Sequence, residues 1–308
     1  MPLGSLVLGF DGRSRDLPMN TQPVDHCIQI NGLPFHYVEW GNAANPTVLI
    51  HHGFMDQCRA WDRVANRLSE QWHLIIPDAR GHGDSGWIGA GATYYFPDYL
   101  LDMHSLLNHL DTKPIAFVGH SMGGSVVSYY VGTYPERAWA IVLVEGMGPP
   151  DMSGMDMPGL FKRYVETASR LIQRPQSTPV QSIEDAANRM TRWDPKLSPE
   201  RARDIAPHAI VQDDNGQFRW KYDPLHRTPM AVPFLLDRVK PLWEKIQCPV
   251  LSLYGADSPF KNNDLSEREA CFHHLQSRVI PDAGHNIHTH KDEELALLIH
   301  QFLESHAA

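Results

Sequence analysis

The sequence predicts an α/β protein whose sheet is mostly parallel and flanked by helices, with a helical segment inserted into it. Three observations lead to this prediction. Short apolar runs typical of buried strands alternate with helical patterns through much of the chain. That alternation stops near residue 147 and resumes near residue 239. The apolar run at 115–118 passes through a glycine-rich turn into a helical pattern, as strands of such sheets do.

The first half of the chain predicts a sheet that starts antiparallel and continues parallel. Residues 1–25 are polar and rich in Gly and Pro, so we expect a loosely held N-terminal arm. The runs 27–30 and 35–40 flank Asn31-Gly32, a strong signal for a β-hairpin. Further strands are expected at 47–52, 73–77, 115–118 and 140–144, alternating with helices that start near residues 60, 97 and 125. This alternation favours right-handed crossovers between parallel strands.

The segment 147–238 has no run typical of a buried strand and is rich in Met, Pro, Arg and Trp. Short helical patterns occur at 160–171, 183–190 and 199–211. A structureless loop of this length would be unusual in a compact domain, so we predict a small helical cap. Strands at 249–254 and 278–281 and helices at 265–275 and 292–303 complete the chain. The predicted division is an arm at 1–25, a core at 26–146 and 239–308, and a cap at 147–238.

Composition excludes several classes of function. The 308 residues carry a formal net charge of −9, which gives no electrostatic basis for binding nucleic acid. No apolar run reaches the length of a membrane span, and residues 1–25 lack the apolar region of a secretory signal. The four cysteines form no C-x-x-C pair and suit free thiols in a reducing compartment. We expect a cytoplasmic monomer or homodimer without integral membrane association.

The nucleophile candidate is Ser121. Gly119-His120-Ser121-Met122-Gly123 matches G-x-S-x-G between the apolar run and the helical pattern, which is the context of a nucleophile elbow. Glycines on both flanks allow a turn too sharp for side chains. The serine hydroxyl then projects from the N-terminus of a helix, where negative charge is favoured.

A serine hydroxyl needs a base to take its proton and an acid to orient that base. His285 follows the last predicted strand in Asp282-Ala283-Gly284-His285 and suits the base. His288 and His290 lie nearer the closing helix, and we expect them to be surface or capping residues. The motif places the acid between the serine and the histidine in the chain.

Two carboxylates satisfy that order at strand ends. Asp257 follows the strand at 249–254, and Glu145 follows the strand at 140–144. We favour Asp257 as the acid because it has a strand-loop of its own and the shorter side chain, and we retain Glu145 as the alternative. Asp282 is a weaker third candidate. The oxyanion of an acyl-transfer intermediate needs two N–H donors, for which we predict the backbone of Phe54 and Met122.

These motifs together resemble the α/β-hydrolase superfamily. The resemblance rests on His52-Gly53-Phe54, the loop 78–85, the elbow at 119–123, Gly255-x-Asp257 and Gly284-His285. The resemblance covers roughly residues 26–146 and 240–305. Within the superfamily, the sequence is most similar to the serine-hydrolase-like and carboxylesterase branch with a cap domain. The segment 220–224 resembles a cap segment of that branch. Ser121 departs from the epoxide hydrolases and haloalkane dehalogenases, which use aspartate there. In the family, the loop 78–85 is structural.

The resemblance and the predicted triad imply a hydrolase of small-to-medium carboxylic esters that forms an acyl-enzyme and requires no metal or cofactor. A lactonase or a C–C bond hydrolase could use the same triad, and the sequence barely separates these reactions. A catalytically silent ligand-binding protein is the alternative from another class. Such proteins usually lose a triad residue, whereas this sequence retains candidates for all three.

Overall fold

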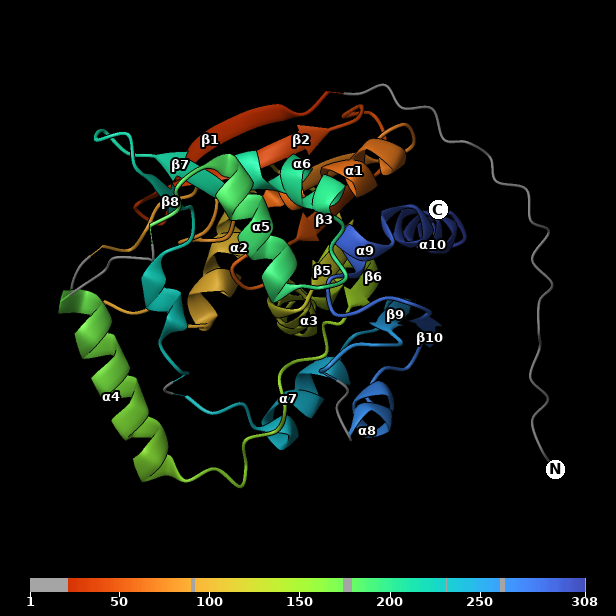
Figure 1. Ribbon diagram of the computed structural model, residues 1–308. Coiled ribbons are helices and arrows are strands. Elements are labelled where there is room, and N and C mark those ends of the chain that lie inside the picture. Colours follow the sequence, from red (N-terminus) through yellow and green to blue (C-terminus); the bar gives the residue numbers. More distant parts are fainter. Residues whose placement is uncertain (1–21, 90–91, 174–178, 231, 261–263, 308) are drawn as a thin grey trace.

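The core of the protein is one eight-stranded sheet, seen in a computed structural model that describes residues 22–89, 92–173, 179–230, 232–260 and 264–307 (Figure 1). Its strands run in the order β1-β2-β4-β3-β5-β6-β9-β10. The strands are β1 (Val24–Ile30), β2 (Leu33–Trp40), β3 (Thr47–His51), β4 (His73–Pro77), β5 (Ile115–His120), β6 (Ala138–Val144), β9 (Val250–Gly255) and β10 (Leu275–Ile280). Strand β2 pairs antiparallel with β1 and β4, and every other pairing in the sheet is parallel. The expected mostly parallel sheet is confirmed.

The sheet begins with the predicted hairpin. Asn31 and Gly32 join β1 to β2 with φ angles of 51° and 81°, the left-handed backbone that a two-residue hairpin turn requires. Asparagine and glycine tolerate this conformation better than other residues. The arm expected at 1–25 lies outside the described residues as far as residue 21, and β1 begins at Val24.

Helices cover both faces of the sheet, so its central strands are buried on both sides. On one face, α1 (Asp62–Leu68) packs against α10 (Asp292–Glu304), and the four-residue α9 (Ile287–His290) lies beside them. On the other face, α3 (Met122–Thr133) packs against α2 (Pro97–His109) and α7 (Leu236–Trp243). Alternate residues of the central strands therefore enter two separate apolar clusters, with Val118 in one and Phe117 in the other.

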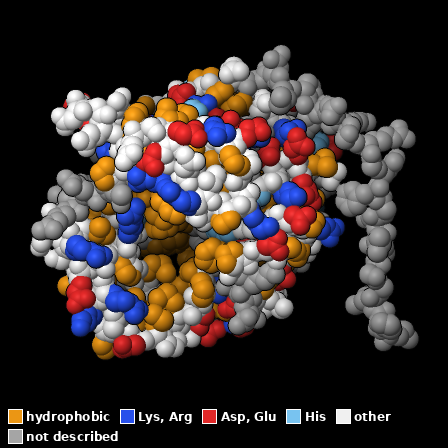
Figure 2. All heavy atoms as spheres, viewed as in Figure 1, with side chains coloured by type: hydrophobic (Ala, Val, Ile, Leu, Met, Phe, Trp, Pro, Cys, Tyr) orange, Lys and Arg blue, Asp and Glu red, His pale blue; other side chains and the backbone are white. Residues whose placement is uncertain are grey.

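Between β6 and β9 the chain leaves the sheet. It forms α4 (Met157–Gln173), α5 (Ile183–Trp193), α6 (Pro199–Ala209) and a hairpin of β7 (Ile210–Gln212) and β8 (Phe218–Trp220) before it reaches α7. The three helices expected in this segment are present, whereas the short hairpin was not predicted. Helix α4 stands away from the sheet, and Figure 2 shows a hollow between α4 and α3 that is lined mostly by hydrophobic side chains and rimmed in part by Lys and Arg.

Near the C-terminus the structure differs from the prediction in two elements. The helix expected at 265–275 is the shorter α8 (Leu265–Glu269), because Leu275 already begins β10. Helix α9 was not predicted, because its four residues are too few for a helical period to be recognised. Among the described helices, none has the length and apolar character needed to cross a membrane.

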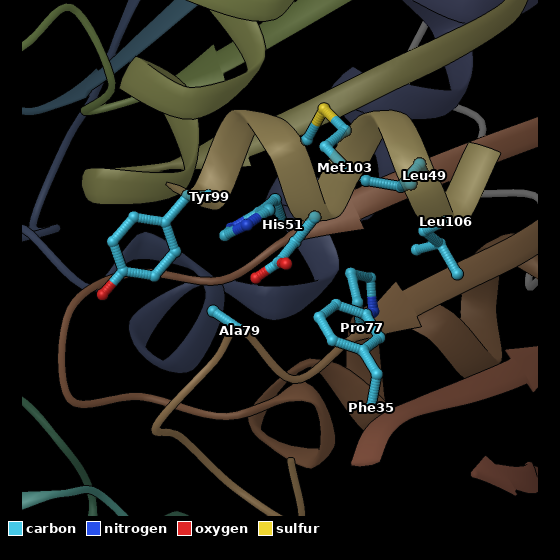
Figure 3. Close-up of a pocket in the computed structure, with 9 residues that line it drawn as sticks. Phe35, Leu49, His51, Pro77, Ala79, Tyr99, Met103 and Leu106 are labelled. Atoms are coloured by element: carbon cyan, nitrogen blue, oxygen red, sulfur yellow. The ribbon is translucent and has the colours of Figure 1, made fainter. Parts of the chain in front are cut away.

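A small cavity lies inside the core between α2 and the sheet (Figure 3). Side chains of Phe35, Leu49, Pro77, Met103 and Leu106 form most of its wall. Ser121 is not among the residues around it. The cavity is therefore a gap in core packing, separate from the hollow in Figure 2.

Candidate active site

Ser121 lies in a strained turn between β5 and α3. Its φ and ψ angles are 51° and −115°, outside the regions that a residue with a side chain normally occupies. The turn is held by hydrogen bonds from Ser121 N–H to the Val144 carbonyl (3.0 Å) and from Gly124 N–H to the Ser121 carbonyl (3.0 Å). This geometry leaves the Ser121 side chain partly exposed at the N-terminus of α3.

Glycine is required beside Ser121 because backbone segments approach closely there. A Cβ atom on Gly123 would lie 2.2 Å from the His51 carbonyl oxygen, and one on Gly124 would lie 2.4 Å from Gly146 Cα. Helix α3 can therefore start directly against β3 and the end of β6 only if both positions lack side chains. Glycines are therefore needed at the elbow for two reasons, the sharp turn of the backbone and the close packing of neighbouring segments.

His285 contacts Ser121 from the loop after β10. Its Nε2 atom lies 2.9 Å from Ser121 Oγ, and 20% of its side chain is exposed. Since the serine hydroxyl can donate to Nε2, the hydrogen of the neutral imidazole belongs on Nδ1. The ring of Phe260, itself exposed, packs 4.5 Å from the His285 ring between centroids.

Glu145 provides the carboxylate at the other side of His285. Its Oε2 atom lies 3.3 Å from His285 Nδ1 and accepts a hydrogen bond from Ser258 Oγ (2.8 Å). Its Oε1 atom accepts from the Gly255 N–H (2.7 Å), and its side chain is 1% exposed. A buried carboxylate needs such partners for both oxygens. Glu145 also has a φ of 54°, so its backbone bends sharply where β6 ends.

Asp257, the acid favoured from the sequence, has a different environment from Glu145. Half of the Asp257 side chain is exposed, and its carboxylate pairs with Lys196 Nζ at 2.7 Å. Glu145 is the carboxylate for which the structure shows a contact with His285 Nδ1. The longer glutamate side chain reaches from β6 past the end of β9. We favoured Asp257 partly for its shorter side chain and did not consider this longer reach. Asp282, the third candidate, is exposed.

The predicted oxyanion donors lie on segments that the structure brings together. A Cβ atom on Gly53 would lie 2.6 Å from His120 Nδ1 and 3.3 Å from Ser121 Cβ, so the loop after β3 passes directly beside the elbow. Among the described residues, the N–H groups of Phe54 and Met122 donate no hydrogen bond to a backbone carbonyl in a turn or loop. No backbone carbonyl of a described turn or loop therefore competes for either group.

Two buried histidines hold the loop after β3 against the loop 78–85. His52 donates from Nδ1 to the Gly53 carbonyl (2.7 Å) and accepts at Nε2 from the Ala79 N–H (2.9 Å). His82 donates from Nδ1 to the Arg80 carbonyl (3.0 Å) and accepts at Nε2 from the Met55 N–H (3.1 Å). Burial holds the pKa of His82 well below its usual value, so the ring is neutral and can accept. Loop 78–85 thus supports the backbone next to Phe54.

The segment between α5 and α6 reaches the loop that carries His285. The carboxylate of Asp194 accepts at Oδ2 from His290 Nε2 (2.8 Å) and from Asn286 Nδ2 (2.7 Å). His290 in turn accepts at Nδ1 from the Gly284 N–H (3.1 Å). Burial alone would raise the pKa of Asp194, but these hydrogen bonds hold it below the usual value. The sequence predicted a surface or capping role for His290, whereas this residue connects two segments that are distant in the chain.

Residues 46–292 match the family model described as the alpha/beta hydrolase fold. The chain therefore belongs to the α/β-hydrolase family, and its relatives place it among the hydrolases of that family.

Two curated relatives align over most of their length. The chain is 30% identical to the 3-hydroxybutyrate-oligomer hydrolase of Cupriavidus necator, over 84% of this chain and 89% of that protein. It is 25% identical to a serine hydrolase-like protein of Danio rerio, over 86% of this chain and 83% of that protein. The second relative agrees with the branch that the motifs resemble.

Among solved structures, a thioesterase domain from the curacin biosynthetic pathway has a similar fold. Its TM-score is 0.79 at 24% sequence identity, over 90% of this chain and 99% of that chain. At this identity the likeness concerns the fold alone.

Proposed function

We propose that this protein is a serine hydrolase that cleaves small-to-medium carboxylic esters through an acyl-enzyme. The observation that carries the proposal is the contact of 2.9 Å between Ser121 Oγ and His285 Nε2, with Glu145 at the opposite ring nitrogen. A serine hydroxyl becomes a useful nucleophile only when a base accepts its proton as it attacks. The proposed triad is therefore Ser121, His285 and Glu145.

In the proposed reaction, Ser121 Oγ attacks the ester carbonyl carbon while its proton passes to His285 Nε2. The tetrahedral intermediate then expels the alcohol, which receives that proton from His285. A water molecule repeats the sequence on the acyl-enzyme, with His285 again as base, and releases the acid. Glu145 keeps the His285 hydrogen on Nδ1 and stabilises the imidazolium that forms in each half-reaction.

The proposed oxyanion donors are the N–H groups of Phe54 and Met122. Their freedom from loop hydrogen bonds supports this role, as does the close approach of Gly53 to Ser121. Donors fixed by the surrounding backbone stabilise developing charge without reorganising during the reaction. His52 and His82 connect the loop after β3 to the loop 78–85 by hydrogen bonds, so they would act as positioning residues for Phe54.

We also propose that residues 147–238 act as a helical cap that shapes the substrate site. The apolar hollow between α4 and α3 supports a site for an uncharged acyl chain (Figure 2). The relative from Cupriavidus necator is named for hydrolysis of 3-hydroxybutyrate oligomers. That name supports esters of short hydroxy acids as the first substrate class to examine here.

A fluorophosphonate probe tests the proposal, because it labels a serine only when the hydroxyl is activated. We expect labelling of the wild-type protein and of Ser153→Ala, an exposed serine between β6 and α4, but not of Ser121→Ala. Hydrolysis should then be measured on acyl esters, 3-hydroxybutyrate dimers and trimers, lactones and a substrate for C–C bond cleavage. Labelling without ester turnover, but with lactone or C–C cleavage, would assign one of those reactions instead. An unlabelled wild-type protein would favour a ligand-binding function.

A further inference from the structure

A second cluster of functional side chains lies behind the proposed nucleophile. Asp56, His120 and His288 come from the loop after β3, the elbow and α9, and each offers an atom within 4.8 Å of the others. His120 and His288 are 2% and 1% exposed. The His288 ring stacks on Trp61 at 4.7 Å between centroids. The centroid of the His120 ring lies 4.6 Å from that of the His288 ring. Trp61 therefore fixes the orientation of one of the two imidazoles.

The hydrogen bonding of His120 leaves a lone pair unused. Its Nε2 atom lies 3.0 Å from the His285 carbonyl oxygen, which can only accept, so Nε2 carries the hydrogen. Nδ1 then has a lone pair, is buried, and has no hydrogen-bond partner among the described residues. Buried polar atoms without a partner are uncommon in folded proteins and require an explanation.

His288 leaves a second ring nitrogen unused. Its Nε2 atom lies 3.1 Å from Asp56 Oδ2 and pairs with it, whereas its Nδ1 atom has no hydrogen-bond partner in the part of the chain that the structure describes. A cation at Nε2 would require the imidazole hydrogen to sit on Nδ1 and would take the place of the direct contact with Asp56. Two ligand atoms at a usual zinc distance from one ion are about 3 Å apart, so this spacing suits a shared cation.

Another group of possible metal ligands, His36, Cys58 and Asp78, differs from this cluster in its hydrogen bonding. Asp78 Oδ2 accepts from His36 Nδ1 (2.8 Å) and from the Asp84 N–H (2.9 Å), and Oδ1 accepts from the Cys58 N–H (2.7 Å). The carboxylate of that cluster already has protein partners. The unpaired ring nitrogens of His120 and His288 therefore distinguish the cluster at Asp56.

We propose that Asp56, His120 and His288 bind a divalent transition-metal cation of the zinc class and that the bound cation inhibits hydrolysis. Two imidazoles and one carboxylate are ligands that zinc accepts, with water in the fourth position. Metal binds the neutral imidazole, which presents a lone pair on one of its ring nitrogens.

Inhibition follows from the segments that the cation would connect. His120 precedes Ser121 and donates to the His285 carbonyl, and Asp56 lies two residues after Phe54. A cation held by all three ligands would draw the elbow, the histidine loop and the oxyanion loop toward one point. Catalytic groups displaced by even a fraction of an ångström lose much of their effect. This part of the inference rests on the proposed function.

Metal binding can be measured without reference to activity. Titration of the metal-free protein with Co²⁺ should give the visible absorption of a tetrahedral site at one equivalent, and calorimetry with Zn²⁺ should give the same stoichiometry. We expect binding in wild type, in Ser121→Ala and in the control His104→Gln, a half-buried histidine bonded to Tyr130 and Asn108. Affinity should fall by about 10-fold or more in Asp56→Asn and in His288→Gln.

The two parts of the proposal fail separately. Undiminished Zn²⁺ affinity in both Asp56→Asn and His288→Gln would overturn the site, and Asp56→Asn decides the matter if His288→Gln does not fold. If wild type hydrolyses esters, the ratio of rates with and without Zn²⁺ should move toward one in Asp56→Asn but not in His104→Gln. An unchanged ratio in Asp56→Asn would overturn the inhibitory role. A protein that binds the cation without hydrolysing any ester would contradict the proposed function and leave the metal site standing.

Discussion

The Oε2 atom of Glu145 lies 3.3 Å from Nδ1 of His285, although the two residues are 140 positions apart. Glu145 stands at the end of β6, and it reaches His285 because its carboxylate is also anchored at Gly255 and Ser258 on the neighbouring strand-loop. We therefore propose Glu145 as the acid, one strand away from Asp257, which we favoured from the sequence.

We predict that Glu145→Gln lowers kcat/KM for an activated ester by about 10³-fold to 10⁴-fold, since an amide favours the wrong imidazole tautomer. Asp257→Asn is the matched control, because it also replaces a carboxylate by an amide but at a residue paired with Lys196, and it should cost only a few-fold. Steady-state kinetics of both purified variants decide the question. A larger loss in Asp257→Asn would return the orienting role to that residue.

Asp194 should act as a positioning residue for the histidine loop. We predict that Asp194→Ala lowers kcat by between about 10-fold and 100-fold, because His290 and Asn286 lose the carboxylate that holds them and His285 loses its fixed position. KM for a small ester should change little, since the described contacts of the Asp194 carboxylate are with the histidine loop and with the Lys196 N–H.

The control is Asp213→Ala, at an exposed aspartate in the turn between β7 and β8. Fluorophosphonate labelling rates give a second readout, because a misplaced base slows the labelling of Ser121 as well. If kcat and labelling were equal in Asp194→Ala and Asp213→Ala, the loop would not depend on this carboxylate.

The length of the acyl chain should affect turnover in two phases. On nitrophenyl esters, kcat/KM should rise over the first carbons, by up to about 0.8 kcal/mol of transition-state stabilisation for each buried methylene, and fall once the apolar hollow is filled. Long-chain triglycerides should be poor substrates, without activation at an oil–water interface. Phe161, Val165 and Ile172 on α4 are exposed apolar residues of the kind that binds an oil–water interface. A test on emulsified substrate is therefore a stringent test of the second expectation. Rates that keep rising at long chain lengths, or that jump on emulsified substrate, would contradict an enclosed site.

The buried histidines should make folding stability sensitive to acid. Burial lowers the pKa of His51 and of His226 to about 3, and it also lowers the pKa of His82, His120 and His288. Each of these rings binds fewer protons when folded than when unfolded, so stability falls as pH drops below the unfolded value near 6.5. The loss approaches about 1.4 kcal/mol per pH unit for each ring that stays neutral.

His36 acts in the opposite direction. Burial would lower its pKa, but its hydrogen bond and attraction to Asp78 raise it, so its contribution is present at low pH and disappears as pH rises through the folded value. The five neutral rings outnumber it. Urea unfolding at about pH 7.5 and about pH 5.5 should therefore give a lower free energy at the acidic value, with a smaller difference in His51→Gln. An equal or larger free energy of unfolding at the acidic value would show that these rings do not remain neutral.

The sequence predicted those features that depend on local pattern. The hairpin at Asn31-Gly32 and the elbow at Ser121 require particular residues for backbone reasons, so both were visible in short stretches of chain. The loop after β10 was recognised by its place at the end of a parallel strand. The acid was not determined, because Glu145 and Asp257 both follow strands, and their order along the chain does not reveal which side chain reaches His285.

The roles of His120, His288 and His290 could not be predicted for a similar reason. Their partners are Asp56, Asp194 and the His285 carbonyl, and each lies on a segment distant in the chain. The burial of a histidine can be predicted from sequence only when the apolar residues around it recur with a helical or strand period. Helix α9 has four residues and is too short to show such a period. Only the tertiary structure distinguishes these rings from surface histidines.

The adjacency of β6 and β9 has a consequence for how the chain folds. These strands pair in parallel although residues 145–249 separate them, and closing so long a connection carries a large entropic cost before any contact compensates for it. Glu145 and Gly255, which meet across this pairing, cannot come together until it forms. During synthesis, Ser121 emerges more than 160 residues before His285, so the proposed triad cannot assemble until the last strand and the loop after it have been added. Reactivity toward a serine probe would therefore report completion of the fold and could time its final step during refolding.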